Sequence, residues 1–112
     1  MKEKKNNIPN EDIRPIGEID RTVHSPARLM ILALLSVVES VDFTFLLTQT
    51  GLTRGNLSSH LGRLEEADYI QINKEFVDRV PRTLIRLTNI GRQAIQTYRD
   101  TMHQVLDGLL KE

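Results

Sequence analysis

Residues 42–87 decide the fold of this chain, and they read DFTFLLTQTGLTRGNLSSHLGRLEEADYIQINKEFVDRVPRTLIRL. The first part predicts a short helix over residues 43–50, because its apolar residues recur at the spacing of one helix face. Asp42 is a suitable N-cap, since its carboxylate can accept a hydrogen bond from a free backbone N–H. Gly51 is expected to end the helix, because glycine readily adopts the left-handed conformation found there.

A second helix is expected over residues 54–67, with Thr53 as its N-cap. Leu57, Leu61 and Leu64 share one face, so only a narrow stripe would be buried. The opposite face carries small polar and basic groups, which can enter the major groove and reach phosphates and base edges. The order helix, tight turn, helix predicts a helix-turn-helix. The candidate DNA contacts on its second helix are Thr53, Arg54, Asn56, Ser58, Ser59, His60 and Arg63.

An ordinary solvated face is the alternative interpretation of these polar residues. However, Gly55, Ser58 and Ser59 are weak helix formers at exposed positions, where Ala, Lys or Glu would favour the helix. That local cost favours a contact surface. The candidates for base edges are Arg54, Asn56, Ser59 and His60, whereas Thr53 and Arg54 suit backbone phosphates at a helix N-terminus and Arg63 suits a phosphate farther along.

Two runs of alternating apolar and polar residues, 69–76 and 82–87, predict a β-hairpin. Residues 77–81 would form its tip, because Pro81 cannot donate to a strand ladder. A helix-turn-helix followed by such a hairpin predicts a mainly α winged helix-turn-helix, with a three-helix core and a wing. Basic residues on the wing could touch flanking phosphates or a minor groove, or simply keep a strand edge soluble. The candidates within residues 74–86 are Lys74, Arg79 and Arg82.

The segments before this stretch complete the predicted domain. Residues 1–12 are polar and charged, and are expected to form a flexible arm. A short helix is expected over residues 15–23, and Ser25-Pro26 should begin the central buried helix, which would run to about Glu39. Residues 13–112 are therefore expected to form one winged-helix domain, with its core and wing at 25–87.

A long C-terminal helix is expected over residues 89–110, capped by Thr88 and forming most of a dimerisation segment at 88–112. Its apolar residues recur every three and four positions, which is the rhythm of a coiled-coil seam. Such a stripe needs an apolar partner, and a second copy of the chain is the natural one. The candidate dimerisation residues are Ile95, Tyr98, Met102, Val105 and Leu109.

Composition excludes several other classes of protein. The chain has 112 residues, no cysteine and a formal net charge of zero, which argues against a general polyanion binder. It lacks a Gly-rich phosphate loop and a nucleophile–base grouping, so we expect no enzyme and no cofactor. Its three histidines are dispersed, so no metal site is expected. The longest apolar run is too short for a membrane span, no signal peptide is visible, and the protein is expected to be cytoplasmic.

The motifs L-S-x-H-L-x-x-L-E-x-x-x-Y-I and R-x-x-x-x-L-T-x-x-G-R resemble those of winged-helix regulators related to the MarR and ArsR groups of bacteria and archaea. The resemblance covers about residues 25–95. It implies a DNA-binding transcriptional regulator, more often a repressor, whose dimer places one recognition helix in the major groove of each half-site and its wings on flanking DNA. Asp68 departs from the glycine common at its turn, and the metal-sensing cysteines are absent. The sequence identifies no small-molecule effector.

A winged helix can also serve as a protein-interaction or scaffold module, because a fold does not fix a function. Zero net charge favours this alternative to some degree. The two interpretations differ in their expected salt dependence, since a DNA binder loses affinity steeply as the salt concentration rises.

Overall fold

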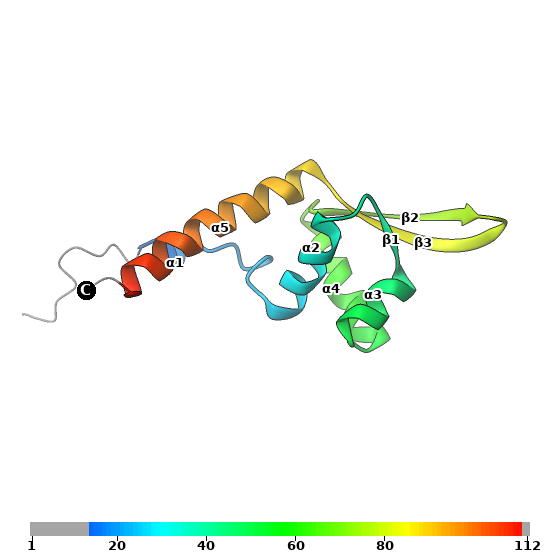
Figure 1. The fold of residues 1–112 in the computed structure, drawn as a ribbon, viewed down its shortest axis with the longest axis horizontal. Helices are drawn as coiled ribbons and strands as arrows, with labels where there is room; N and C mark the ends of the chain where they lie inside the picture. The colour runs from blue at the N-terminus through cyan, green and yellow to red at the C-terminus, as the bar shows by residue number, and fades with distance from the viewer. Residues whose placement is uncertain (1–13, 111–112) are drawn as a thin grey trace, which may run out of the picture.

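The computed structural model describes residues 14–110, and its elements form an elongated molecule of 71 × 26 × 23 Å. Helix α5 extends toward one end and the β2–β3 hairpin toward the other, with α2, α3 and α4 between them and α1 beside α5 (Figure 1). This arrangement confirms the predicted winged helix with a long C-terminal helix. The elements are α1 (Arg14–Gly17), α2 (Pro26–Ser36), β1 (Val41–Asp42), α3 (Phe43–Thr50), α4 (Arg54–Glu66), β2 (Ile70–Val77), β3 (Val80–Leu87) and α5 (Asn89–Leu110).

The hydrophobic core lies where α2, α3 and α4 meet the base of the sheet. Its side chains are almost all Leu, Ile and Val, as expected for a chain with few aromatic residues. Helix α2 contributes Ile31, Leu32 and Leu35, which have at most 1% of their surface exposed, so it is the central helix as predicted. The complete buried set is Val23, Ile31, Leu32, Leu35, Leu46, Leu57, Leu61, Leu64, Ile70 and Ile85.

The predicted helix caps are confirmed, and they explain where the helix pair begins and turns. The Asp42 carboxylate accepts a hydrogen bond from the backbone N–H of Phe45 at 2.8 Å, which caps α3. Gly51 follows with a φ of 69°, in the left-handed region that glycine adopts without a steric cost. The Thr53 hydroxyl accepts from the N–H of Asn56 at 3.1 Å and so caps α4.

The sheet has three strands in the order β1-β3-β2, so the predicted hairpin is correct but incomplete. Val41 and Asp42, expected to be part of a link, pair with Ile85 and Leu84 of β3. A two-residue strand leaves no alternation in the sequence by which to recognise it.

The wing is longer than predicted, because only Asp78 and Arg79 form its tip. Both have positive φ, 51° and 68°, which is the conformation of a type I′ hairpin turn. Pro81 lies within β3 opposite Phe76 rather than in the tip. It is tolerated because β1 reaches no farther out than Leu84, so β3 has one neighbouring strand there.

Two predicted helix extents were wrong. Helix α2 ends at Ser36, not near Glu39. The expected helix over residues 15–23 is limited to α1, and a turn follows in which the Asp20 carboxylate accepts hydrogen bonds from the N–H groups of Thr22 and Val23. A short polar side chain that bonds its own backbone competes with the helix. The predicted arm at 1–12 lies outside the described residues.

The junction between the wing and α5 is tightly packed. Thr88 caps α5, since its hydroxyl accepts from the N–H of Gly91 at 2.9 Å and donates to the carbonyl of Asp68 at 2.6 Å. Asp68 itself has a φ of 64°, so it adopts the left-handed conformation that glycine more often supplies at this turn. A Cβ atom added to Gly91 would lie 2.1 Å from the carbonyl oxygen of Tyr69, so no larger residue fits there without a shift.

Candidate nucleic-acid interface

Helix α4 has one buried face and one exposed face, as the sequence predicts. Leu57, Leu61 and Leu64 are at most 3% exposed and hold the helix on the core. A surface of small polar and basic residues lies opposite, and it includes Gly55 and Gly62, where an added Cβ would meet nothing within 4 Å. The candidate contact residues that are exposed on this helix and its cap are Thr53, Arg54, Asn56, Ser58, Ser59 and Arg63.

His60 differs from the other candidates, because it is half-buried and faces the chain itself. Its Nδ1 lies 2.9 Å from a terminal guanidinium nitrogen of Arg28 on α2. Burial lowers the pKa of His60, and the positive charges of Arg28 and Arg63 lower it further. A neutral imidazole whose Nδ1 accepts a hydrogen bond from Arg28 fits these surroundings.

Arg28 is the functional neighbour that the sequence did not reveal. It is 7% exposed, and its Nε donates to the carbonyl of Thr22 at 2.6 Å. A terminal nitrogen donates to the carbonyl of Arg21 at 3.3 Å. Burial, followed by the charge of Arg63, lowers the pKa of Arg28. Arg28 thus joins the segment before α2 to helix α4, and only its position in an otherwise apolar helix could have drawn attention to it.

The segment before α2 is also tied to the wing base and to α5. The Tyr69 hydroxyl donates to the Asp20 carboxylate, and this bond, with burial and the carboxylate charge, raises the pKa of Tyr69 to about 12. Nδ1 of His24 lies 2.8 Å from the hydroxyl oxygen of Tyr98 on α5. Residues 20–28 therefore form a bridge between α5, the wing base and α4.

A hollow of about 230 Å³ lies between the N-terminal ends of α3 and α4 and the wing. The Arg54 guanidinium sits 5.6 Å from the centre of the Phe43 ring, close enough for a cation–π contact. The Arg82 guanidinium pairs with the Asp42 carboxylate at 3.0 Å. Both arginines belong to the predicted set, and the structure brings them to one hollow although they are far apart in sequence. Its lining residues are Asp42, Phe43, Thr44, Arg54, Pro81, Arg82 and Thr83.

The outer wing presents two further candidates to solvent. Lys74 and Arg79 are exposed, and Arg79 lies in the turn at the tip. Closer to the base, Arg86 pairs with Glu75 at 3.6 Å. The tip also exposes apolar surface, since 78% of Phe76 and 47% of Val80 is accessible. The outer wing is therefore a mixture of cationic and apolar groups.

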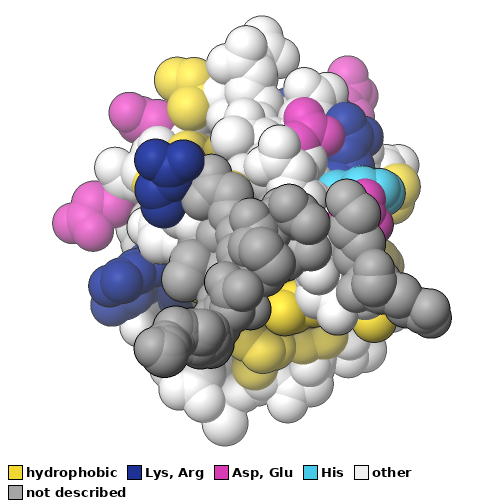
Figure 2. Space-filling model, turned by 90° about the vertical axis from the view of Figure 1, so that its left-hand side faces the viewer, with side chains coloured by type: hydrophobic (Ala, Val, Ile, Leu, Met, Phe, Trp, Pro, Cys, Tyr) yellow, Lys and Arg dark blue, Asp and Glu magenta, His cyan; other side chains and the backbone are white. Residues whose placement is uncertain are grey.

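The five predicted dimerisation residues fall into two groups along α5. Ile95 and Tyr98 are half-buried and pack partly against the core of their own chain. Met102 and Val105 are partly exposed, and 71% of Leu109 is accessible. Leu106 and Leu110 add to the apolar surface at this end. Figure 2 views this end of the molecule and shows hydrophobic side chains beside charged ones.

Among residues 14–110, no group of three or more His, Cys, Asp or Glu side chains could hold a metal ion. Within the same residues, no helix is long and apolar enough to cross a membrane.

The chain belongs to the family described as the winged helix DNA-binding domain, whose model matches residues 27–106. The uncharacterized protein MJ0432 of Methanocaldococcus jannaschii is 39% identical over 75 residues, which cover 67% of this chain and 82% of that protein.

Three solved structures share the fold of this chain. The transcriptional regulator homologue from Pyrococcus horikoshii OT3 has a TM-score of 0.80 and 29% identity, covering 87% of this chain and 98% of its own. The transcriptional repressor CouR, bound to a 23-mer DNA duplex, has a TM-score of 0.66 and 21% identity, and the match covers 88% of this chain and 70% of CouR. A MarR-family regulator from Silicibacter pomeroyi has a TM-score of 0.58 and 20% identity, and the match covers 88% of this chain and 71% of that regulator. Family and fold therefore point to a transcriptional regulator of MarR-like architecture rather than an enzyme.

Proposed function

We propose that this protein regulates transcription as a homodimer that binds duplex DNA in a sequence-dependent way. The observation that carries the proposal is the surface of α4, which is fixed to the core by three leucines and presents small polar residues with Arg54 and Arg63. A low, rigid, hydrogen-bonding helix face is what readout in the major groove requires. Repression is the favoured direction, because CouR shares the fold and is a repressor bound to DNA.

The roles within the proposed interface follow from position. Asn56 and Ser59 are assigned to base edges, with Thr53 and Ser58 beside them. Arg54, at the start of α4, is assigned both to a backbone phosphate and to the adjacent base edge, and Arg63 is assigned to a phosphate. Lys74, Arg79 and Arg82 are assigned to the DNA that flanks the half-site. His60 would act through Arg28 by holding α4 in place rather than by touching a base, since its ring faces that guanidinium.

The second copy would pair with the first through the exposed stripe of α5. Met102, Val105 and Leu109 reach beyond the core of their own chain, and they would be covered in the dimer. Two copies matter for affinity, because a chain of zero net charge gains little from unspecific attraction to DNA. Linking two weak half-site contacts raises the overall affinity without any new contact.

The proposal is tested in two steps. Bound sequences are selected from a random DNA pool, and fluorescence anisotropy then measures affinity for the selected duplex. Arg54→Ala should weaken binding to the selected site by about tenfold or more and relax its base preference. Arg79→Ala should weaken binding to selected and random duplexes to a similar extent. It should also reduce the slope of log affinity against log salt by about one. Arg99→Ala removes an equal charge from α5, where Arg99 pairs with Asp100, and is the matched control.

A protein-interaction module is the second candidate function, and two observations favour it. The net charge is zero, and Phe76 is the most exposed large apolar side chain of the wing, at 78%. Absence of binding to both selected and random duplexes at about 50 mM salt would reject DNA binding in favour of this module. An unchanged affinity in Arg54→Ala would instead remove that residue from the interface.

A further inference from the structure

The hollow beside α3 and α4 combines two cations with one anion that restrains one of them. Arg54 reaches it from α4 and Arg82 from the wing, while Asp42 stands at the start of α3. Arg54 lies over the Phe43 ring, and among residues 14–110 no ion pair to it is found. Arg82 is paired with Asp42 at 3.0 Å, with 44% of the Arg82 side chain and 24% of the Asp42 side chain exposed.

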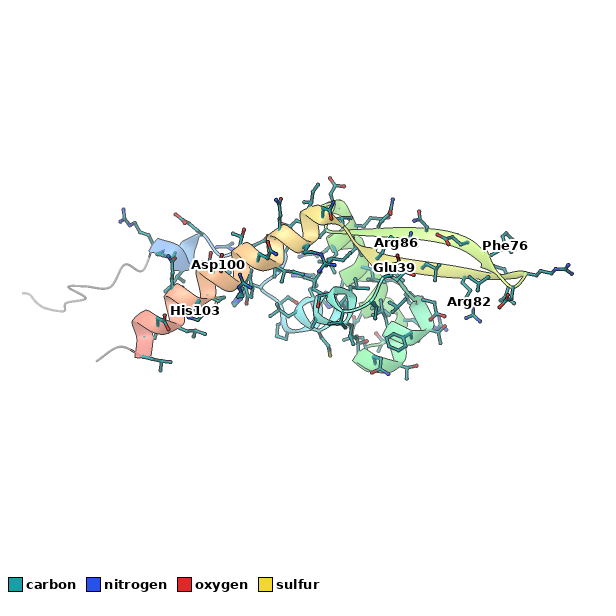
Figure 3. All side chains as sticks on the ribbon, turned by 45° about the horizontal axis from the view of Figure 1, so that its top comes forward. Glu39, Phe76, Arg82, Arg86, Asp100 and His103 are labelled. Atoms are coloured by element: carbon teal, nitrogen blue, oxygen red, sulfur yellow. The ribbon has the colours of Figure 1, made fainter. Side chains whose placement is uncertain are left out.

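The position of the hollow suits the backbone of a DNA strand. A duplex whose major groove holds α4 and whose flanking groove holds the wing must pass one sugar–phosphate strand between these two elements. Figure 3 shows Arg82 projecting from the wing on the side where α3 and α4 lie, whereas Phe76 projects to the other side. Register agrees, since Arg82 is opposite Glu75 and Phe76 is opposite Pro81.

We propose that this hollow seats a phosphodiester group of duplex DNA between Arg54 and Arg82, and that Asp42 competes with this phosphate for Arg82. The proposal rests on the proposed function and adds a site and an acidic residue that limits affinity. An exposed ion pair is weak, so a phosphate can displace the Asp42 carboxylate from Arg82. The displaced carboxylate then remains near the phosphate and repels it.

Such a competing acid would limit the affinity for DNA of any sequence. Every duplex supplies the phosphate, so each complex meets the cost of breaking the Arg82–Asp42 pair. Neutralising Asp42 should therefore improve binding to random and selected sequences to a similar extent, because a cost common to both cancels from the preference.

Asp42→Asn removes the charge of this residue but keeps its ability to cap α3. The Asp42 carboxylate also caps α3 through the N–H of Phe45, and asparagine is as good an N-cap as aspartate. The variant should therefore keep the fold, which far-UV circular dichroism and thermal unfolding would verify. Asp100→Asn is the matched control, because Asp100 is also an exposed partner of an arginine but lies on α5, away from the wing (Figure 3).

Anisotropy with a random-sequence duplex, titrated with salt from about 50 to about 200 mM, measures the effect. Asp42→Asn should bind about three- to tenfold more tightly than wild type at the lowest salt, with a slope of log affinity against log salt steeper by about 0.9, as for one added phosphate contact. Asp100→Asn should stay within about twofold of wild type. Arg82→Gln should cost more affinity in the Asp42→Asn background than in wild type, because Arg82 is then free to bind the phosphate.

Two results would overturn this inference while leaving the proposed function intact. Binding by Asp42→Asn that equals wild type would mean that Asp42 does not compete with DNA. Weaker binding by a folded Asp42→Asn would mean that Asp42 holds Arg82 in its DNA-binding position. A wild-type protein that binds no duplex at the lowest salt would reject the proposed function itself.

Discussion

Helices α4 and α5 have apolar residues at similar spacings, but these residues are buried on α4 and largely exposed at the far end of α5. The stripe of α4 is closed by its own chain, and its three leucines are 0–3% exposed. On α5 the only buried residue among those described is Gly91, and Leu109 is 71% exposed. Figure 1 shows the reason, since α4 lies within the helix cluster and the far end of α5 extends away from it.

This difference separates two uses of the same sequence pattern. On α4 the apolar stripe fixes the helix on the core and holds its polar face in one position. On α5 only the first turns, up to about Tyr98, reach the core; the short helix α1 lies beside the far part of α5 (Figure 1), and Leu109 stays 71% exposed. Substitutions on α4 should therefore change the stability of each chain, whereas equivalent ones on α5 should change association between chains.

Leu57→Ala should have the largest effect on folding. Leu57 is 0% exposed, and truncating a buried leucine removes apolar contacts and leaves a cavity, which costs about 3 kcal/mol of unfolding free energy. Urea denaturation followed by circular dichroism measures it. The neighbouring exposed residue supplies the control, because Ser58→Ala should raise stability by a few tenths of a kcal/mol, since alanine is the better helix former. Equal losses in both variants would contradict this account of α4.

Met102→Glu should chiefly affect association. A carboxylate placed on the exposed stripe must be desolvated in the pairing of two α5 helices, so the dissociation constant of the dimer should rise by about 100-fold. Sedimentation over a range of protein concentrations measures it. Gln104→Glu adds the same charge on an exposed position outside the stripe and should leave the dimer intact. A wild-type chain that is monomeric at micromolar concentration would remove the stripe from consideration as an interface.

Gly91→Ala tests the one point at which α5 is anchored as tightly as α4. The new Cβ would lie 2.1 Å from the Tyr69 carbonyl oxygen, so the wing–α5 junction must move, at a cost of about 2 kcal/mol. Gly62→Ala on α4 is the matched control, since its Cβ would meet nothing within 4 Å and should stabilise the helix by up to about 1 kcal/mol. A stabilising Gly91→Ala would show that the junction is looser than these contacts indicate. Thermal unfolding of both variants measures the difference.

Local chemistry made much of the fold predictable from the sequence. The caps at Asp42, Thr53 and Thr88 and the left-handed Gly51 depend on residues within four positions of one another, and all four are confirmed. Strand β1 was missed because it exists only through pairing with Ile85, which is remote in the sequence.

The candidate sites of DNA contact were predictable from the sequence only as one face of α4. Exposed Ser and Arg residues on α4 follow from the spacing of its leucines. The pairing of His60 with Arg28 spans 32 positions, and that of Arg82 with Asp42 spans 40, so neither follows from any local pattern. Both were found only once tertiary structure brought α2, α3, α4 and the wing together.

His60→Gln should have the smallest effect, and it should appear as a change in pH dependence. Because the folded pKa of His60 is lowered below its ordinary value of 6.5, the folded chain binds fewer protons there than the unfolded chain. Stability from this group is therefore present above about pH 6.5 and is lost as pH falls toward the folded pKa. Urea denaturation at about pH 7.5 and about pH 5.5 should show a smaller difference for His60→Gln than for wild type. If the variant keeps the full pH dependence, then His60 does not supply it, and the ring that joins α4 to Arg28 is not held in its neutral form by these charges.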